Sequence, residues 1–202
     1  QLSVELSYRG HWVLSEAGTS VYGYNFERAY ERSGAAHNVL QLGLADPSGD
    51  TQWIEPVEVW GGFRAARKAQ PRDRQSGMLS NSACFAAGSH DGFDRIGASH
   101  VRRVQLSDAR PQEITLTVEE TVTNRRSLQF RQWWHLAPSV PSEWMDGLAF
   151  EAPTAEAIHT SWHSTWFSEG FGQRIPRQSF CLSGCLPPGE HQLRITLPLS
   201  VS

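Results

Sequence analysis

The sequence has 202 residues, which is enough for one all-β domain or at most two small domains. Hydrophobic residues make up 39% and charged residues 19%, a composition typical of a globular domain rather than a disordered chain. No apolar run approaches the ~20 residues of a membrane-spanning helix. The net charge of −3 and the pI of about 6.2 lack the basic character of nucleic-acid-binding proteins. We therefore expect no membrane span and no nucleic-acid partner.

The composition has two biases that bear on ligands. Lys68 is the single lysine among 18 cationic residues, and the other 17 are arginine. Arginine pairs with carboxylates and sulfates at two points, so this bias suits an anionic ligand, although a GC-rich coding bias explains it too. The eight tryptophans are expected to fill mainly the core, but an exposed tryptophan also stacks on sugar rings.

The three cysteines are Cys84, Cys181 and Cys185. An odd number in a chain of this length is not a disulfide framework, and the spacing does not fit a structural zinc site. A bond between Cys181 and Cys185 stays open at this stage.

Apolar and polar residues alternate along most of the chain, which predicts β-strands. The alternation begins at once, in residues 2–8, so we interpret Gln1 as the start of a piece cut from a longer protein. Turn signals rich in Gly, Pro and Asp separate the alternating segments, and no segment keeps a helical stripe over three turns. The alternating segments that follow are 40–44, 57–59, 101–106, 114–118, 128–134 and 193–197.

These patterns predict one domain over residues 1–202: an all-β, antiparallel β-sandwich of many short strands. Residues 65–77 form the loosest stretch, because charged residues interrupt the alternation there.

Five short strings, in this order, resemble motifs of the heparinase II/III-like polysaccharide lyases. Residues 16–22 (Glu-Ala-Gly-Thr-Ser-Val-Tyr) are similar to the Asp-Pro-Gly-Thr-x-x-Tyr motif, and residues 34–38 (Gly-Ala-Ala-His-Asn) are similar to a segment with Ala-His-Asn. Residues 57–64 (Val-Glu-Val-Trp-Gly-Gly-Phe-Arg) resemble Ser-Glu-x-Trp-Gly-x-Phe-Arg. Residues 90–93 (His-Asp-Gly-Phe) and 100–103 (His-Val-Arg-Arg) resemble His-Asp-Gly-Tyr and His-x-Arg-Arg.

The resemblance implies a two-part enzyme in which a helical toroid and a C-terminal β-sandwich enclose the substrate. This chain resembles the sandwich alone, so a helical toroid domain would precede residue 1 as its partner. A His-x-His-x-Asp string that the family usually carries just before this point is absent from the sequence. The fragment is therefore expected to carry only part of the catalytic apparatus.

The chemistry that the resemblance implies is β-elimination at a uronic acid, so the expected substrate is an acidic polysaccharide. A base takes the C5 proton, an acid protonates the leaving oxygen at C4, and the uronate charge must be neutralised. The motif match makes Tyr22 and His37 the candidate catalytic residues, with Tyr24 and Tyr30 as competitors of Tyr22. The alternative for each tyrosine is a half-buried structural role.

The resemblance also implies one divalent metal, most simply zinc, bound in this fragment by Glu16 and His37. Carboxylate and neutral imidazole are good zinc ligands. Glu16 replaces the family's aspartate and Ala17 replaces its proline, and a ligand from the absent string would be lacking. The site is therefore incomplete in this fragment. Alternatively, Glu16 is a turn residue and His37 a hydrogen-bonded core histidine.

A second group of candidates consists of substrate-binding residues in the later strings. Arg64 and Arg102 are candidates for pairing with a uronate carboxylate, and Trp60 is a candidate for stacking on a sugar ring. His90 belongs to the same group, although His90 and Asp91 also fit a turn ahead of a glycine.

Three functions are consistent with these patterns. The chain is the sandwich portion of a lyase in a periplasmic or secreted protein, a non-catalytic carbohydrate-binding module, or a structural support of the toroid. Fold alone does not separate them, since sandwiches host many functions.

Overall fold

The computed structural model describes residues 2–60, 64–110 and 113–199. Its first strands are β1 (Leu6–Tyr8), β2 (His11–Leu14), β3 (Leu40–Ala45), β4 (Thr51–Ile54), β5 (Val57–Trp60), β6 (Arg64–Lys68), β7 (Pro71–Ser80) and β8 (Ala83–His90). The later strands are β9 (Ala98–Arg110), β10 (Glu113–Asn124), β11 (Leu128–His135), β12 (Ala149–Glu151), β13 (Glu156–Phe167), β14 (Ile175–Leu186) and β15 (Gly189–Leu199). Helical segments are α1 (Phe26–Arg32) and the 3-10 turns η1 (Gly34–Ala36), η2 (Asp91–Ile96) and η3 (Ser142–Met145).

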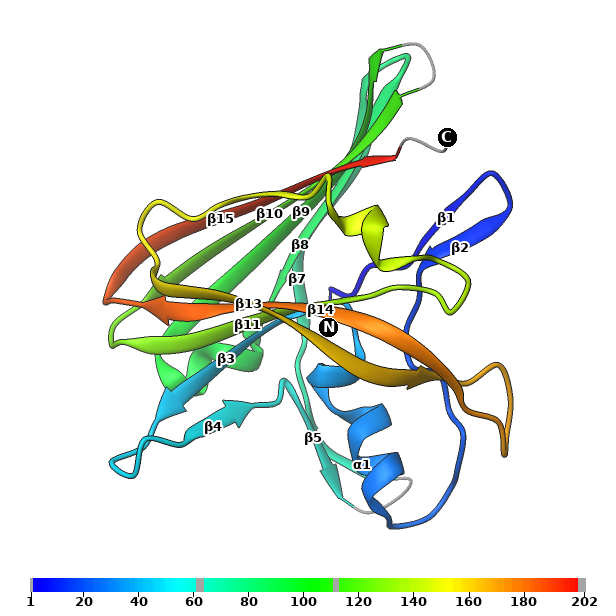
Figure 1. Cartoon of the computed structure of the whole chain (residues 1–202). Helices are drawn as coiled ribbons and strands as arrows, with labels where there is room; N and C mark the ends of the chain where they lie inside the picture. The colour runs from blue at the N-terminus through cyan, green and yellow to red at the C-terminus, as the bar shows by residue number, and fades with distance from the viewer. Residues whose placement is uncertain (1, 61–63, 111–112, 200–202) are drawn as a thin grey trace.

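The strands form an antiparallel β-sandwich, which confirms the predicted fold class (Figure 1). One layer is a six-stranded sheet in the order β12-β15-β10-β9-β8-β7. The other layer is a five-stranded sheet in the order β13-β14-β11-β3-β4. The hairpins β1-β2 and β5-β6 form two further small sheets.

Strand length differs from the expectation of short strands. β9, β10, β13, β14 and β15 have between 11 and 13 residues each. β10 pairs along its length with both β9 and β15, with one register irregularity between Glu113 and Ile114. Polar residues that shorten the apparent pattern lie within these long strands, as Thr117 does opposite Gln105 and Thr196.

The stretch 65–77 was predicted to be loose, and this prediction is wrong. β6 and most of β7 lie in it, and every residue of β7 is exposed. β7 is the edge strand of the six-stranded sheet, where charged side chains block further pairing. The charges that hide the alternation are therefore those expected at a sheet edge.

The helix α1 is an element that the alternation does not indicate. Asn25 caps it, because the Asn25 side chain accepts a hydrogen bond of 2.8 Å from the Arg28 amide. The helix has only seven residues, which is too short for a periodic stripe to be visible. It leads directly into η1 and so sets the start of the segment that carries His37.

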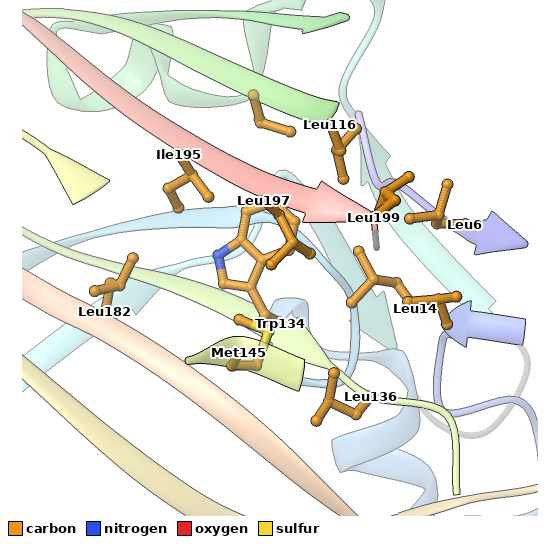
Figure 2. Close-up of a cluster of buried hydrophobic side chains, with 12 residues drawn as sticks. Leu6, Leu14, Leu116, Trp134, Leu136, Met145, Leu182, Ile195, Leu197 and Leu199 are labelled. Carbon is orange, nitrogen blue, oxygen red and sulfur yellow. The ribbon is translucent and has the colours of Figure 1, made fainter. Parts of the chain in front are cut away.

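Apolar side chains between the two large sheets form two buried clusters. One cluster surrounds Trp134 of β11, Leu136 just after it, and Ile195 and Leu197 of β15, with Leu14 of β2 on one side (Figure 2). The second surrounds Phe93 of η2 and Phe130 of β11. Within the described residues, no helix is long and apolar enough to cross a membrane.

The expectation that most tryptophans fill the core holds only in part, because Trp53, Trp144 and Trp166 are half-buried. Trp133 and Trp134 are buried on opposite faces of β11, as successive strand residues must be. Trp12, Trp60 and Trp162 are between 43% and 67% exposed, and they belong to three different sheets. They therefore form no single row of stacking surfaces.

Candidate functional site

Glu16 and His37 form one hydrogen-bonded pair, although 21 residues separate them in the sequence. Glu16 follows β2, and His37 follows η1. The His37 Nδ1 atom lies 2.6 Å from Oε2 of Glu16, and both side chains are about one quarter exposed. Burial raises the pKa of Glu16, but the hydrogen bond and charge of His37 outweigh it, so this pKa lies below its ordinary value. Glu16 is therefore ionised at neutral pH.

The ionised carboxylate decides which ring nitrogen of His37 is available. Because Glu16 accepts the hydrogen bond, Nδ1 carries the proton of a neutral His37 and Nε2 keeps its lone pair. Such a nitrogen accepts a proton or binds a metal. The two site residues predicted for metal binding are thus brought together, and Nε2 of His37 is the atom suited to either role.

The turn that carries His37 is fixed from one side by a chain of polar contacts. The Gly34 amide donates to Oε2 of Glu55 over 2.8 Å, and Gln41 donates to the other oxygen of Glu55 over 2.8 Å. Arg131 and Trp133 in turn donate to the Gln41 side-chain oxygen, over 2.6 and 3.0 Å. Burial raises the pKa of Glu55, although these contacts act in the opposite direction.

Asn38 fixes the same turn from the other side. Its side-chain oxygen accepts from the His135 amide over 2.6 Å, and its side-chain nitrogen donates to the Val4 carbonyl over 2.9 Å. Its own carbonyl accepts from Arg102 over 2.6 Å. Polar partners therefore hold Gly34, three residues before His37, and Asn38, directly after it, so His37 is pre-positioned.

The protein groups available for a metal are limited to this pair. Glu16 and His37 supply a carboxylate oxygen and an imidazole nitrogen, which are suitable zinc donors. Among the described residues, no group of three His, Cys, Asp or Glu side chains is close enough to hold a metal ion. The donor types fit zinc, but a full set of ligands needs groups beyond this pair.

The three candidate tyrosines have different environments. Tyr22 is 56% exposed and stacks on Phe171 with a centroid distance of 5.2 Å. Tyr24 is 91% exposed. Tyr30 is half-buried against Trp166, and burial raises its pKa. Tyr22 and Tyr24 are accessible to a large substrate, whereas Tyr30 lies in α1 and packs the helix against Trp166.

Trp60 and Arg64 are brought together, as the prediction requires. They are register partners at the end of the β5-β6 hairpin, and both are exposed. Residues 61–63, which belong to the same motif, lie outside the described residues. The Arg64 carbonyl accepts a hydrogen bond of 3.3 Å from Arg32 of α1, so the hairpin end rests on the helix that precedes η1.

A groove of about 500 Å³ runs between α1 and β5, beside this hairpin. Arg28 and Arg32, one helical turn apart, line it together with Glu55. Its other walls are largely apolar and include Tyr24, Phe26, Val57 and Val59. These lining residues were not predicted from the sequence, and the Asn25 cap before an Arg-containing segment is the signal that points to them.

His90 and Arg102 are almost fully buried, which is a correction to their prediction as substrate-binding residues. Arg102 is 2% exposed, and it donates to both carboxylate oxygens of Glu120, itself 1% exposed. His100 also contacts Glu120, over 2.7 Å. The charges of Arg102 and His100 lower the pKa of Glu120 to about 2, although burial acts to raise it. Arg102 is thus committed to an internal ion pair.

His90 serves the backbone, as the alternative interpretation of this string proposed. It is 6% exposed, and its Nδ1 accepts a hydrogen bond of 3.1 Å from the Gly92 amide at the start of η2. Asp91 accepts from the Gln70 amide over 2.7 Å. Cys84, Cys181 and Cys185 are free, so the pairing left open for the last two does not occur.

The chain is similar to known proteins over nearly its whole length. The model of the family "Heparinase II/III-like, C-terminal" matches residues 1–196. The chain therefore belongs to the heparinase II/III-like C-terminal domain family, as the five sequence strings indicated. Comparison with curated protein sequences gives no match.

Solved structures support the fold. The heparan sulfate lyase HepC of Pedobacter heparinus is similar with a TM-score of 0.66 at 16% identity, over 98% of this chain and 30% of that chain. The heparinase III BT4657 gene product gives a TM-score of 0.67 at 12% identity, over 99% and 30%. Another heparinase III structure gives 0.65 at 14% identity, over 99% and 30%. The chain thus spans about 30% of the length of these structures.

The buried ion pair leads to a stability prediction. Arg102→Ala should lower the free energy of unfolding by about 3–5 kcal/mol, because it leaves the Glu120 charge buried without its main partner. The exposed Arg194, which pairs with Glu119 over 2.8 Å, is the matched control on the same sheet. Arg194→Ala should cost about 1 kcal/mol or less. Urea unfolding of both variants measures the difference, and equal small losses would contradict an internal role for Arg102.

His90 leads to a prediction on acid stability. Burial, and then the charge of His100, lower the pKa of His90 to about 4, while Asp91 acts in the opposite direction. Below pH 6.5 the unfolded chain gains a proton that folded His90 takes up only near pH 4. Its contribution to the free energy of unfolding is therefore fully present above pH 6.5. About 3 kcal/mol of this contribution is lost as the pH falls to 4.

The variant His90→Asn tests this contribution, because asparagine can still accept from the Gly92 amide but does not titrate. Compared with wild type, His90→Asn should lose less unfolding free energy between pH 7 and pH 4. The exposed His159 supplies the control His159→Asn, which should keep the wild-type dependence. The assignment fails if all three proteins lose the same free energy over this range.

Proposed function

We propose that this chain is the β-sandwich portion of a polysaccharide lyase that cleaves uronic-acid-containing acidic polysaccharide by β-elimination. The observation that carries the proposal is the partly exposed Glu16–His37 pair, held in place from both sides by buried polar contacts. A domain that only supported its neighbours would not need a histidine with a free ring nitrogen at the surface. Membership of the family and the heparinase structures support the reaction class.

Residues of this chain are suited to the proton transfers and to substrate binding in this reaction. With Nδ1 bound to Glu16, Nε2 of His37 can take the C5 proton of a uronate, which starts the elimination. The exposed phenol of Tyr22 can donate a proton to the leaving oxygen at C4. Breaking the C4–oxygen bond then leaves a C4–C5 double bond on the new chain end. Exposed Arg64 is suited to receive a carboxylate, and Trp60 beside it to stack on a ring.

A divalent metal is the second role proposed for the pair. Glu16 and His37 would hold it, with zinc favoured by the donor types, and a bound cation would supply positive charge at the site. Two ligands give weak binding, so further ligands would come from the longer protein.

The longer protein is proposed to contain a helical toroid domain as the partner of this sandwich. The support is that the chain spans about 30% of the structures it resembles. We also propose a periplasmic or secreted location, where acidic polysaccharides such as heparan-like, alginate-like, capsular or exopolysaccharide polymers are met. The isolated 202-residue chain should then be inactive as a lyase.

The role of His37 can be tested in the longer protein by following the absorbance of the unsaturated product. His37→Ala should reduce turnover by about 10²- to 10⁴-fold, because proton transfer is lost. Since the side chain is one quarter exposed, its removal should change the unfolding free energy by about 1 kcal/mol or less. His159→Ala is the control. Full activity of His37→Ala, or a loss explained by unfolding, would end the proposal for this residue.

Substrate charge gives a separate test. Arg64→Ala should raise KM for an acidic polysaccharide about 10-fold, equivalent to about 1.4 kcal/mol of lost binding. Arg67 lies on the same strand β6, is exposed and lies outside the motif of residues 57–64, so Arg67→Ala is a matched control. A screen of acidic and neutral glycans completes the measurement. Cleavage confined to neutral glycans would contradict the proposed substrate class.

A further inference from the structure

Arg177 of β14 carries a buried positive charge that has no carboxylate partner. The residue is 4% exposed. Burial lowers its pKa to about 10, so the guanidinium stays protonated at neutral pH. Among residues 2–60, 64–110 and 113–199, no carboxylate oxygen lies within ion-pair distance of it. A buried charge of this kind is costly, and a sheet residue packed for stability alone would not require it.

The guanidinium holds the backbone on both sides of the Ser15–Glu16 peptide bond. Its Nη1 atom donates to the carbonyls of Ser15 and Glu16, over 2.6 and 3.2 Å, and to the Ser15 hydroxyl over 3.1 Å. Its Nε atom donates to the Thr165 hydroxyl over 3.3 Å, which fixes the plane of the guanidinium. Arg177 thus links β14 to the segment that follows β2.

This segment is also joined to the turn that carries His37. The Ser15 amide donates to the His135 carbonyl and the Ala17 amide donates to the Ala36 carbonyl, each over 3.1 Å. Glu16 therefore has a fixed backbone while its carboxylate remains partly exposed. Since Glu16 lies in no strand or helix, these contacts are what sets the position of its side chain against His37.

Two groups counter the effect of burial on Arg177. Tyr30 raises the pKa of Arg177 most, and the charge of Glu16 raises it next. Burial raises the pKa of the Tyr30 phenol, so Glu16 is the neighbour that carries a negative charge at neutral pH. The arginine is thus both a clamp on the Glu16 backbone and a nearby positive charge.

We propose that Arg177 is the positioning residue of the Glu16–His37 pair. It holds the Glu16 carboxylate where it accepts from Nδ1 of His37, which in turn keeps Nε2 open. The geometry of this inference stands on the contacts above, and its meaning for catalysis rests on the proposed function.

The inference can be tested on the 202-residue chain by NMR of the histidine side chains. In wild type, the Nδ1 proton of His37 should give a downfield, slowly exchanging signal, typical of a hydrogen bond to a carboxylate. Arg177→Gln should abolish this signal, and Arg177→Lys, which keeps the charge with fewer donors, should shift it part of the way. Arg174→Gln is the matched control, because Arg174 is exposed and pairs with Glu27 over 3.1 Å.

Thermal melts identify which variants are folded before the signals are compared. A folded Arg177→Gln with the wild-type His37 signal overturns the inference. If Arg177→Gln does not fold, a wild-type signal in Arg177→Lys overturns it instead. Absence of the hydrogen-bonded signal in wild type also overturns it.

Turnover in the longer protein separates this inference from the proposed function. Arg177→Gln should lower kcat about 10- to 100-fold with little change in KM, as expected for a residue that orients another, and Arg177→Lys should restore part of it. A longer protein without lyase activity, but with a His37 signal that depends on Arg177, would refute the proposed function and leave the positioning role intact. An active longer protein whose kcat is unchanged in Arg177→Gln would refute the positioning role and leave the proposed function intact.

Discussion

The ion pair between Arg102 and Glu120 is the constraint from which the candidate site is built. It joins β9 to β10 at register partners inside the sandwich, where both side chains are almost fully buried. Arg102 has donors left after binding Glu120, and one of them reaches the Asn38 carbonyl beside His37. The same Nη1 atom also binds the Leu2 carbonyl, over 2.6 Å. A single buried guanidinium therefore ties the sheet, the first residues and the His37 turn together.

The contacts of Asn38 also connect the His37 turn to the segment that carries Glu16. Its side chain binds the His135 amide at the end of β11, and the His135 carbonyl receives the amide of Ser15. Burial, and then the charge of Arg177, lower the pKa of His135 well below its usual value, so His135 stays neutral. Arg177 then fixes the carbonyls of Ser15 and Glu16 from β14. Glu16 and His37 thus meet at the end of two chains of contacts that both begin in the core.

The sequence predicted the sandwich because alternation marks strands whichever residues carry it. It predicted Glu16 and His37 as a pair only through a family motif, since no local pattern joins residues 21 positions apart. It failed for Arg102 because alternation does not say which face is inward. Val101 is 40% exposed while His100 and Arg102 point inward, the reverse of the usual order. The sequence does contain a pattern that indicates the ion pair. A β9-β10 hairpin sets Glu120 opposite Arg102, so two opposite charges share one face.

The polar residues around the site also explain why an otherwise ordinary sandwich keeps charges in its interior. Replacing a buried ion pair by apolar residues of similar volume is often neutral or stabilising, so Arg102, Glu120 and Arg177 are a poor choice for stability alone. The two arginines, however, each direct donors to backbone carbonyls that no strand or helix would hold, and Glu120 fixes Arg102 for this role. Glu16 and His37 both lie on such irregular segments, and apolar packing cannot fix the direction of a carboxylate or an imidazole ring. The buried charges therefore give this domain what its sheets cannot provide, a defined orientation for two side chains at its surface.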